Sequence, residues 1–191
     1  MRPAIFFDRD DTLIECSSRG LYYVVSHNQV KITPEAVEAL DGAGLAGWQL
    51  VCVTNQSCIG RGLLDLDAFE AVMLEVVSQW CDVLGVSDTI YYAVEKRPRG
   101  DLYMKFEPLA LPYDIHVFVC THTGEQGCTW RKPRTGMLAA AEEMLGIDLA
   151  SPRTVVIGDS VADRSMAASA QLRYYDVNVD GWRHITKELG V

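Results

Sequence analysis

The sequence predicts an α/β fold, a Rossmann-like three-layer α/β/α sandwich built on a mainly parallel sheet. Three short apolar runs each end in polar residues: AIFFD at 4–8, LVCVTN at 50–55 and TVVIGD at 154–159. Apolar residues without alternation, over about four to six positions, are typical of strands buried on both faces. Helical patterns lie between these runs, and strands that alternate with helices usually pair in parallel.

Three helices are predicted from their caps and apolar faces. The first begins after Thr33, a common N-cap residue, with Pro34 in its first turn. The second is expected to carry Asp67 and Glu70 as a capping pair. Its apolar face, at helical spacing, consists of Leu66, Phe69, Met73, Val76, Val77, Trp80 and Leu84. The third is expected over residues 134–145, where a glycine follows its end.

Further strands are predicted at TIYYAV (89–94), IHVFVC (115–120) and RYYDV (173–177), with a packing helix at WRHITKEL (182–189). Residues 95–114 fit no regular pattern and are interpreted as an insertion. Its cations Lys96, Arg97 and Arg99 have two interpretations. A solvated basic loop is favoured, because charge runs usually are solvated. The alternative is that these three side chains bind a second phosphate or an anionic tail of the substrate.

Length and composition favour one globular domain over residues 1–191. The formal charge of −9 argues against nucleic acid or an anionic membrane as the main partner, but not against a small phosphorylated metabolite. No apolar run reaches the roughly 18 residues of a membrane span, and the first ten residues do not match a signal peptide. We therefore expect a cytoplasmic protein, a monomer by default, with its six cysteines mainly reduced.

Polar side chains follow all three apolar runs. Asp8 and Asp10 follow the first, Thr54 and Asn55 end the second, and Asp159 ends the third. The carboxyl ends of parallel strands meet at one edge of a sheet, where ligands bind. The acids would repel one another there unless a cation lay among them. Carboxylates together with a substrate phosphate suit Mg²⁺, so the sequence predicts a magnesium site.

Phosphoryl transfer would also use a cation and two distinct carboxylates. Lys132, in the stretch RKP, supplies the positive charge that a phosphoryl group needs. An aspartate can act as a nucleophile and form an acyl-phosphate. A second carboxylate two residues further on can protonate the leaving group and then deprotonate the attacking water.

Four stretches, DRDDT, VTNQS, RKP and GDSVAD, resemble in order and spacing the four motifs of the haloacid dehalogenase (HAD)-type phosphatases, over nearly the whole chain. VTNQSCIGRG and the CTH…CTWRKP segment look like the branch that holds heptose-bisphosphate phosphatases and histidinol-phosphate phosphatase domains. Members of that branch lack a large cap domain and shape the site with loops. The resemblance implies the same for this chain.

The resemblance also implies roles for the acids. Asp8 resembles the nucleophile and Asp10 the general acid/base. Mg²⁺ would be held by Asp8, by the backbone carbonyl of Asp10 and by Asp159, with Asp163 in support.

The remaining roles concern the substrate. Thr54, Asn55 and Lys132 would hold the phosphoryl group, and Arg61 and Arg131 would reach the rest of the molecule. The implied activity is a magnesium-dependent phosphomonoesterase with an aspartyl-phosphate intermediate. Its first expected substrate is D-glycero-D-manno-heptose 1,7-bisphosphate, at the 7-phosphate. Alternatives are histidinol phosphate, a polynucleotide 3′-phosphate, which the negative charge disfavours, and a catalytically silent relative that binds a phosphorylated ligand or a protein.

The loop at about 120–130 departs from the branch. Cys120, His122 and Cys128 have the character of a zinc site, which normally has four ligands. The resembling phosphatases carry a second cysteine directly before RKP, where this chain has Trp130. Two interpretations stay open: a three-ligand Zn²⁺ site, or, as is favoured, a loop without metal in which Trp130 fills the vacated place.

Overall fold

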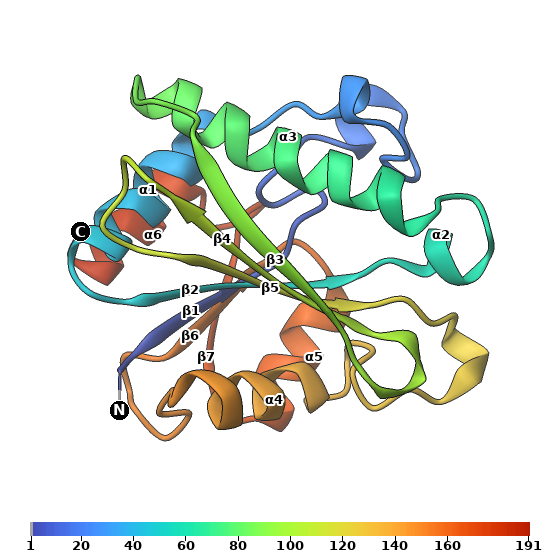
Figure 1. The fold of residues 1–191 in the computed structure, drawn as a ribbon. Coiled ribbons are helices and arrows are strands. Elements are labelled where there is room, and N and C mark those ends of the chain that lie inside the picture. The colour runs from blue at the N-terminus through green and yellow to red at the C-terminus, as the bar shows by residue number, and fades with distance from the viewer. Residues whose placement is uncertain (1) are drawn as a thin grey trace.

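The computed structural model describes residues 2–191. A seven-stranded sheet with the order β3-β4-β5-β2-β1-β6-β7 forms its centre (Figure 1). The strands are β1 (Ala4–Phe7), β2 (Gln49–Asn55), β3 (Ile90–Lys96), β4 (Leu102–Pro108), β5 (Ile115–Cys120), β6 (Val155–Gly158) and β7 (Arg173–Asp176). From β5 to β7 all neighbours in the sheet pair in parallel, whereas β3, β4 and β5 pair antiparallel. The predicted mainly parallel sheet is confirmed.

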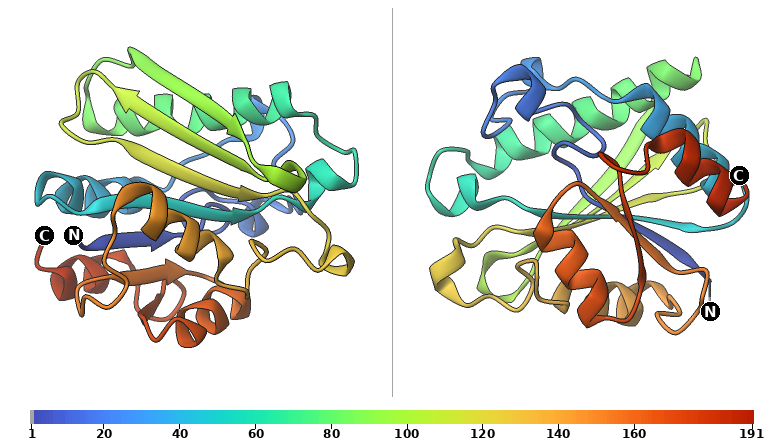
Figure 2. Two further views of the ribbon diagram at one scale, coloured as in Figure 1. Left: turned by 60° about the horizontal axis from the view of Figure 1, so that its bottom comes forward. Right: turned by 180° about the vertical axis from the view of Figure 1, so that it is seen from behind.

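Helices cover both faces of the sheet, which gives the predicted three layers (Figures 1 and 2). They are α1 (Pro34–Leu45), α2 (Ser57–Gly60), α3 (Leu66–Leu84), α4 (Gly136–Leu145), α5 (Val161–Ser169) and α6 (Trp182–Leu189), with 3₁₀ turns η1 (Ser17–Arg19), η2 (His27–Gln29), η3 (Pro98–Gly100) and η4 (Gly124–Gln126). The helices α1, α3 and α6 lie on one face, and α4 and α5 lie on the other. Each face packs its own apolar cluster. None of the helices in residues 2–191 is long and apolar enough to cross a bilayer.

The central strands β1, β2 and β6 are the three apolar runs of the sequence. Every residue of β1 and β6 is buried, which explains their continuous apolarity. Because β5, β2, β1, β6 and β7 are parallel, their carboxyl ends lie at one edge of the sheet, the end at which α2 and the 120–130 loop lie in Figure 1. The described residues form no separate cap domain over this edge (Figure 2).

The interpretation of residues 95–114 as an irregular insertion is wrong. Residues 95 and 96 complete β3, a turn with η3 follows, and β4 returns antiparallel before pairing with β5. The favoured basic loop is thus the tip of a β-hairpin, where Arg97 pairs with Glu95. The strand β4 was not recognised in the sequence because Lys105 and Glu107 interrupt its apolar residues. On the strand, these two side chains form an ion pair with each other.

Two expected helix ends are also corrected. The N-cap of α3 is Asp65, whose Oδ1 accepts a hydrogen bond from the backbone N–H of Ala68 at 2.8 Å, so Asp67 and Glu70 are not its capping pair. The helix α4 begins at Gly136 rather than at residue 134, because the backbone N–H groups of Arg134 and Gly136 close turns onto Arg131 and Thr129.

Candidate active site

The structure brings the acids of two sheet strands to one place. Asp8 follows β1, and Asp159 follows β6. Asp163 is fully buried in the first turn of α5, where it forms a capping box with Ser160. One carboxylate oxygen from each of these three residues lies within 4.8 Å of the others. The convergence predicted from the strand ends therefore exists.

Lys132 lies among these acids. Its Nζ is 2.7 Å from Oδ1 of Asp8 and 2.7 Å from Oδ1 of Asp163. Lys132 is almost completely buried, and burial alone would lower its pKa. The two carboxylates outweigh that effect and raise the pKa of Lys132, so the side chain carries a positive charge.

The acids remain crowded despite the lysine. Burial, aided by Asp163, raises the pKa of Asp8 to about 7, although Lys132 opposes the shift. Burial and the neighbouring carboxylate of Asp163 also raise the pKa of Asp159 to about 6. Oxygen donors that hold their protons this tightly need more positive charge before they all ionise. Asp8, Asp159 and Asp163 therefore fit a hard divalent cation such as Mg²⁺.

The carboxylate of Asp10 accepts hydrogen bonds from a different set of residues. The guanidinium of Arg9 donates to it from Nη2 at 2.8 Å and 3.0 Å and from Nε at 3.1 Å. Gln56 Nε2 donates to Oδ2 at 2.8 Å, and the Cys16 thiol donates to Oδ1 at 3.3 Å. Burial would raise the pKa of Asp10, but Arg9 and Gln56 outweigh it and lower that pKa. The side chain of Asp10 keeps 30% of its surface exposed, so this carboxylate is both fixed and accessible.

Arg9 and Gln56 were missed by the sequence reasoning. Arg9 is completely buried, its Nη2 also donates to Gln56 Oε1 at 3.0 Å, and its guanidinium carbon lies 5.6 Å from the ring centroid of Phe69. A signal for Arg9 was present, since an arginine that directly follows a buried strand needs an acidic partner. Gln56 follows β2 without a comparable signal.

The polar residues that end β2 are divided between two tasks. Thr54 accepts a hydrogen bond from Gln56 Nε2 at 2.7 Å, so its own hydroxyl proton remains available to a phosphoryl oxygen. Asn55 Nδ2 donates to the backbone carbonyl of Lys132 at 3.1 Å, and the Lys132 N–H donates to Asn55 Oδ1 at 3.0 Å. Asn55 therefore positions the backbone of Lys132, and its predicted contact with the phosphoryl group stays a prediction.

The two arginines expected at the substrate are not equivalent. Arg61 is exposed just after α2. Arg131 is half-buried, and its Nη1 donates to the backbone carbonyl of His122 at 2.8 Å. The structure therefore ties Arg131 to the cysteine-containing loop and leaves Arg61 on the surface.

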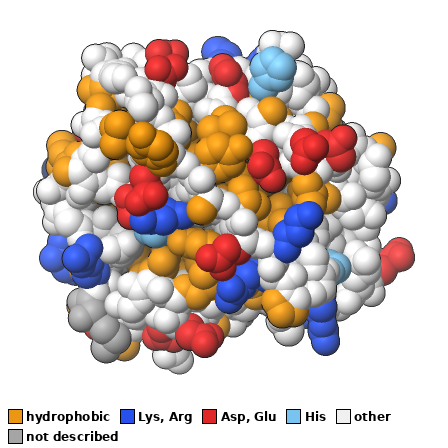
Figure 3. Space-filling view, in the orientation of Figure 1, with side chains coloured by type: hydrophobic (Ala, Val, Ile, Leu, Met, Phe, Trp, Pro, Cys, Tyr) orange, Lys and Arg blue, Asp and Glu red, His pale blue; other side chains and the backbone are white. Residues whose placement is uncertain are grey.

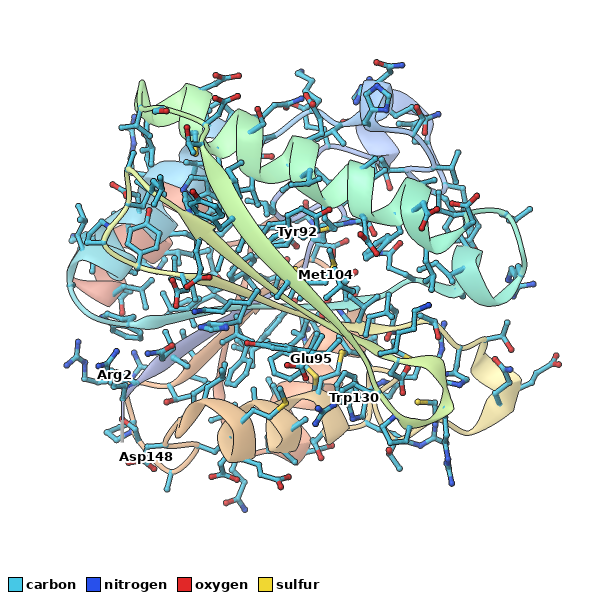
Figure 4. The ribbon with its side chains drawn as sticks, viewed as in Figure 1. Arg2, Tyr92, Glu95, Met104, Trp130 and Asp148 are labelled. Carbon is cyan, nitrogen blue, oxygen red and sulfur yellow. The ribbon has the colours of Figure 1, made fainter. Side chains whose placement is uncertain are left out.

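The cysteine-containing loop has a fourth neighbour that the sequence did not suggest. Cys120, His122 and Cys128 come together as predicted, and the carboxylate of Asp101 lies among them, with one ligand atom from each within 4.8 Å of the others. Trp130 lines one cavity together with Asp101 and Cys128, and the interpretation that it fills the vacated place stays a prediction. The ring of Trp130 packs on Phe118 with centroids 5.5 Å apart. Figure 4 shows Trp130 beside the hairpin tip.

Comparison with known proteins places this site in a family. The model of the family described as polynucleotide kinase 3 phosphatase matches residues 3–180, which is nearly the whole chain. The chain belongs to this family. The match includes both strands of the hairpin and all residues of the candidate site.

Similar proteins share the phosphatase character. The chain is 30% identical over 175 residues to D-glycero-beta-D-manno-heptose-1,7-bisphosphate 7-phosphatase of Salmonella typhi, covering 89% of this chain and 77% of that protein. It is 29% identical over 171 residues to the D-glycero-D-manno-heptose-1,7-bisphosphate 7-phosphatase of Thermosynechococcus vestitus, covering 88% of this chain and 75% of that protein.

The chain is also similar to a solved phosphatase structure. D,D-heptose 1,7-bisphosphate phosphatase from B. bronchiseptica, complexed with magnesium and phosphate, is 25% identical with a TM-score of 0.68. The match covers 98% of this chain and 87% of that one. The chain is thus a phosphatase of the HAD type, as the four motifs predicted.

Proposed function

We propose that this chain is a magnesium-dependent phosphomonoesterase that works through a phosphorylated Asp8. The observation that carries this proposal is the position of Lys132, whose Nζ lies 2.7 Å from carboxylate oxygens of both Asp8 and Asp163. A buried cation between an aspartate that follows a strand and an aspartate in the first turn of a helix can neutralise a phosphoryl group bound at Asp8. Asp8, Asp159, Asp163 and the backbone carbonyl of Asp10 would hold Mg²⁺, which when bound neutralises the phosphoryl oxygens.

In the first half-reaction Asp8 is the nucleophile. Its Oδ1 is held by the backbone N–H of Arg9 at 2.7 Å and by Lys132, which leaves Oδ2 to attack phosphorus. The bond between phosphorus and the ester oxygen breaks, and the leaving oxygen takes a proton from Asp10. The negative charge of the bound phosphoryl group raises the pKa of Asp10 and so helps it to carry that proton.

In the second half-reaction water attacks the phosphorus of the aspartyl-phosphate. Asp10, now a carboxylate, takes the proton of that water. The bond between phosphorus and Asp8 breaks, which restores the Asp8 carboxylate and releases inorganic phosphate. The low pKa that Arg9 and Gln56 impose on Asp10 suits this step, because the step needs a proton acceptor.

We further propose a small phosphorylated metabolite as the substrate, namely D-glycero-D-manno-heptose 1,7-bisphosphate at its 7-phosphate. The names of the relatives support this choice. A cavity of about 290 Å³ adjoins the site, lined by residues that include Asp11, Ser17, Thr33, Asp159 and Asn178, and such polar groups suit the hydroxyls of a sugar. Arg61 and Arg131 remain the predicted partners of the distal part. A monomer and a cytoplasmic location also stay predictions.

A polynucleotide 3′-phosphate is the second candidate, because the description of the matching family names it. The charge of −9 disfavours it. On the face seen in Figure 3, lysine and arginine side chains are interspersed with aspartate and glutamate rather than gathered into one stripe.

The test is phosphate release from heptose 1,7-bisphosphate, histidinol phosphate and a 3′-phosphorylated oligonucleotide, each with Mg²⁺ and with EDTA. We expect magnesium-dependent turnover of the heptose, and a loss of at least ~10³-fold in kcat for Asp8→Asn. Asp67→Asn, an exposed change on α3, is the matched control and should keep full activity. Unchanged turnover by folded Asp8→Asn protein would contradict the mechanism. Preference for another substrate would contradict the substrate assignment alone.

A further inference from the structure

The hairpin of β3 and β4 brings an acidic residue to the cysteine-containing loop. In the register of β4 and β5, Leu102 lies opposite Val119. One step further along these antiparallel strands, Asp101 comes beside Cys120. The turn before it is tight: the N–H of Arg97 donates to the carbonyl of Asp101 at 2.7 Å, and Arg99 and Gly100 have positive φ angles of 71° and 89°. The position of Asp101 is therefore fixed by strand pairing and not by a mobile loop.

The four side chains have the spacing of a metal site. Asp101 Oδ1 lies 3.0 Å from His122 Nδ1, and its Oδ2 lies 3.2 Å from Cys128 Sγ. Cys120 Sγ lies 3.8 Å from His122 Nδ1. Bond lengths of about 2.0–2.3 Å to a tetrahedral Zn²⁺ imply ligand separations of roughly 3.3–3.8 Å. The observed separations lie close to that range.

Burial makes the cluster unusual for a group of side chains without a cation. Asp101 is 3% exposed, and both cysteines are buried. A buried carboxylate is costly unless a positive charge accompanies it. Arg97, at the same hairpin tip, pairs with Glu95 instead. The partners of Asp101 in the structure are the thiol of Cys128, the ring of His122 and the N–H of Thr121, of which only the imidazole could become positive.

We propose that Asp101 supplies the fourth ligand of a Zn²⁺ site with Cys120, His122 and Cys128. The carboxylate on the hairpin replaces the ligand that Trp130 cannot provide. On binding, the metal takes both sulfurs as thiolates, and the two thiol protons pass to solvent. His122 binds through Nδ1 as the neutral imidazole, and Asp101 binds as a carboxylate.

Such a site would link the hairpin tip to the phosphoryl site. The loop runs from Cys128 directly to Arg131 and Lys132. Arg131 is already tied to the carbonyl of His122, and Lys132 is tied to Asn55. A metal shared between Asp101 and the loop would therefore fix the segment that delivers the lysine, without itself touching substrate. The inference concerns this segment and does not depend on which phosphate ester is cleaved.

The test is metal content and cobalt spectroscopy of the full chain. We expect one zinc per chain after reconstitution and dialysis. With Co²⁺ we expect the thiolate charge-transfer and intense ligand-field bands of a tetrahedral site. Asp101→Asn should weaken zinc binding by at least ~10-fold, since even changes outside the ligand set cost this much. Asp101→Cys, which keeps a ligand, should retain zinc. Glu95→Gln, at the same hairpin but outside the cluster, is the matched control.

Two results would overturn the inference: wild-type protein that holds no zinc and gives no tetrahedral cobalt spectrum, or folded Asp101→Asn protein that binds zinc as tightly as wild type. The wild-type measurement keeps the test decisive if Asp101→Asn does not fold. Asp8→Asn should keep its zinc, so an error in the proposed catalytic mechanism and an error in the zinc site give different results.

Discussion

At the scale of single residues, Arg9 governs the acid/base chemistry through Asp10. Arg9 is completely buried and contacts Asp10 through both Nε and Nη2, a fork that lysine cannot reproduce. Its positive charge is a main reason why the pKa of Asp10 is lowered against the effect of burial. Arg9 is thus a positioning residue that also sets the proton affinity of the residue beside it.

Replacing Arg9 should therefore move the pH dependence of the reaction. In Arg9→Met the pKa of Asp10 rises, because burial remains and the guanidinium is gone. In the pH profile of kcat, the inflections that report the titration of Asp10 should move to higher pH by at least ~1 unit, and kcat should fall. Arg9→Lys keeps the charge and should give a smaller displacement. The measurement is the pH profile of kcat for both variants, with circular dichroism to verify folding. A profile that keeps its position in folded Arg9→Met would refute this role.

Single residues also mark the limit of what the sequence predicts about the site. Asp8, Asp159 and Lys132 were predicted because each follows or precedes a recognisable motif. Asp101 was not, since nothing local distinguishes it from a solvated acid in a polar stretch. Only the pairing of β4 with β5 brings it to Cys120, and strand register across long sequence separations is not encoded in a short window.

At the scale of elements, the N-terminus of α3 gives a clear test of cap assignment. Asp65 has extended backbone angles and its carboxylate accepts the Ala68 N–H, as an N-cap residue should. Asp67 lies inside the first turn, where its carboxylate is near the positive end of the helix dipole.

Asp65→Ala should therefore lower the free energy of unfolding by about 1 kcal/mol. Asp65→Asn keeps an acceptor oxygen and should stay within ~0.3 kcal/mol of wild type. Asp67→Ala should cost less than Asp65→Ala. Urea unfolding of the three variants, followed by far-UV circular dichroism, measures these differences. Equal losses for Asp65→Ala and Asp67→Ala would show that the cap is not the source of the stability.

The elements that were predicted correctly share a physical property. The strands β1, β2 and β6 lie in the centre of the sheet, so burial on both faces leaves continuous apolar runs. The helix α3 has one buried face, and its helical spacing was recognised from Leu66 to Leu84, although its N-cap was misplaced. The strand β4 was missed because its charged residues pair along the strand, so its apolar pattern is interrupted although most of the strand is buried.

At the scale of the whole molecule, the parallel sheet concentrates negative charge at one edge. Asp8 directly follows β1 there, Asp159 directly follows β6, and Asp163 lies in the first turn of α5. Without a divalent cation this arrangement opposes folding wherever Asp8 and Asp159 ionise, because the folded state raises the pKa of these two carboxyls above the values in the unfolded chain. The site is thus built at some cost in stability, which a bound divalent cation would offset.

The pH dependence of stability should reveal this cost. The pKa values of Asp8 and Asp159, raised from 3.8 to about 7 and about 6, mean that the folded state binds more protons than the unfolded chain between about pH 4 and 7. The contribution of these two groups to stability therefore falls as the pH rises through that window. Asp10, whose pKa is lowered, titrates below the window and does not reverse this trend within it.

Mg²⁺ should restore the stability that the protein loses when Asp8 and Asp159 ionise. The effect should be stronger at about pH 8 than at about pH 5, where protons compete with the metal. In EDTA at pH 8, Asp8 and Asp159 are ionised, and we expect this to make the Tm lower than it would be if both carboxyls were protonated. We expect millimolar Mg²⁺ to raise the Tm at pH 8 by at least ~2 °C, which corresponds to roughly 1 kcal/mol for a chain of this size. Thermal unfolding with EDTA and with Mg²⁺ at both pH values measures the two increments in Tm.

Asp159→Asn removes one ligand and one repelling charge, so it should stabilise the metal-free protein at pH 8 and reduce its response to Mg²⁺. An increment that is larger at pH 5 than at pH 8 would mean that the acids at this edge are not the magnesium ligands.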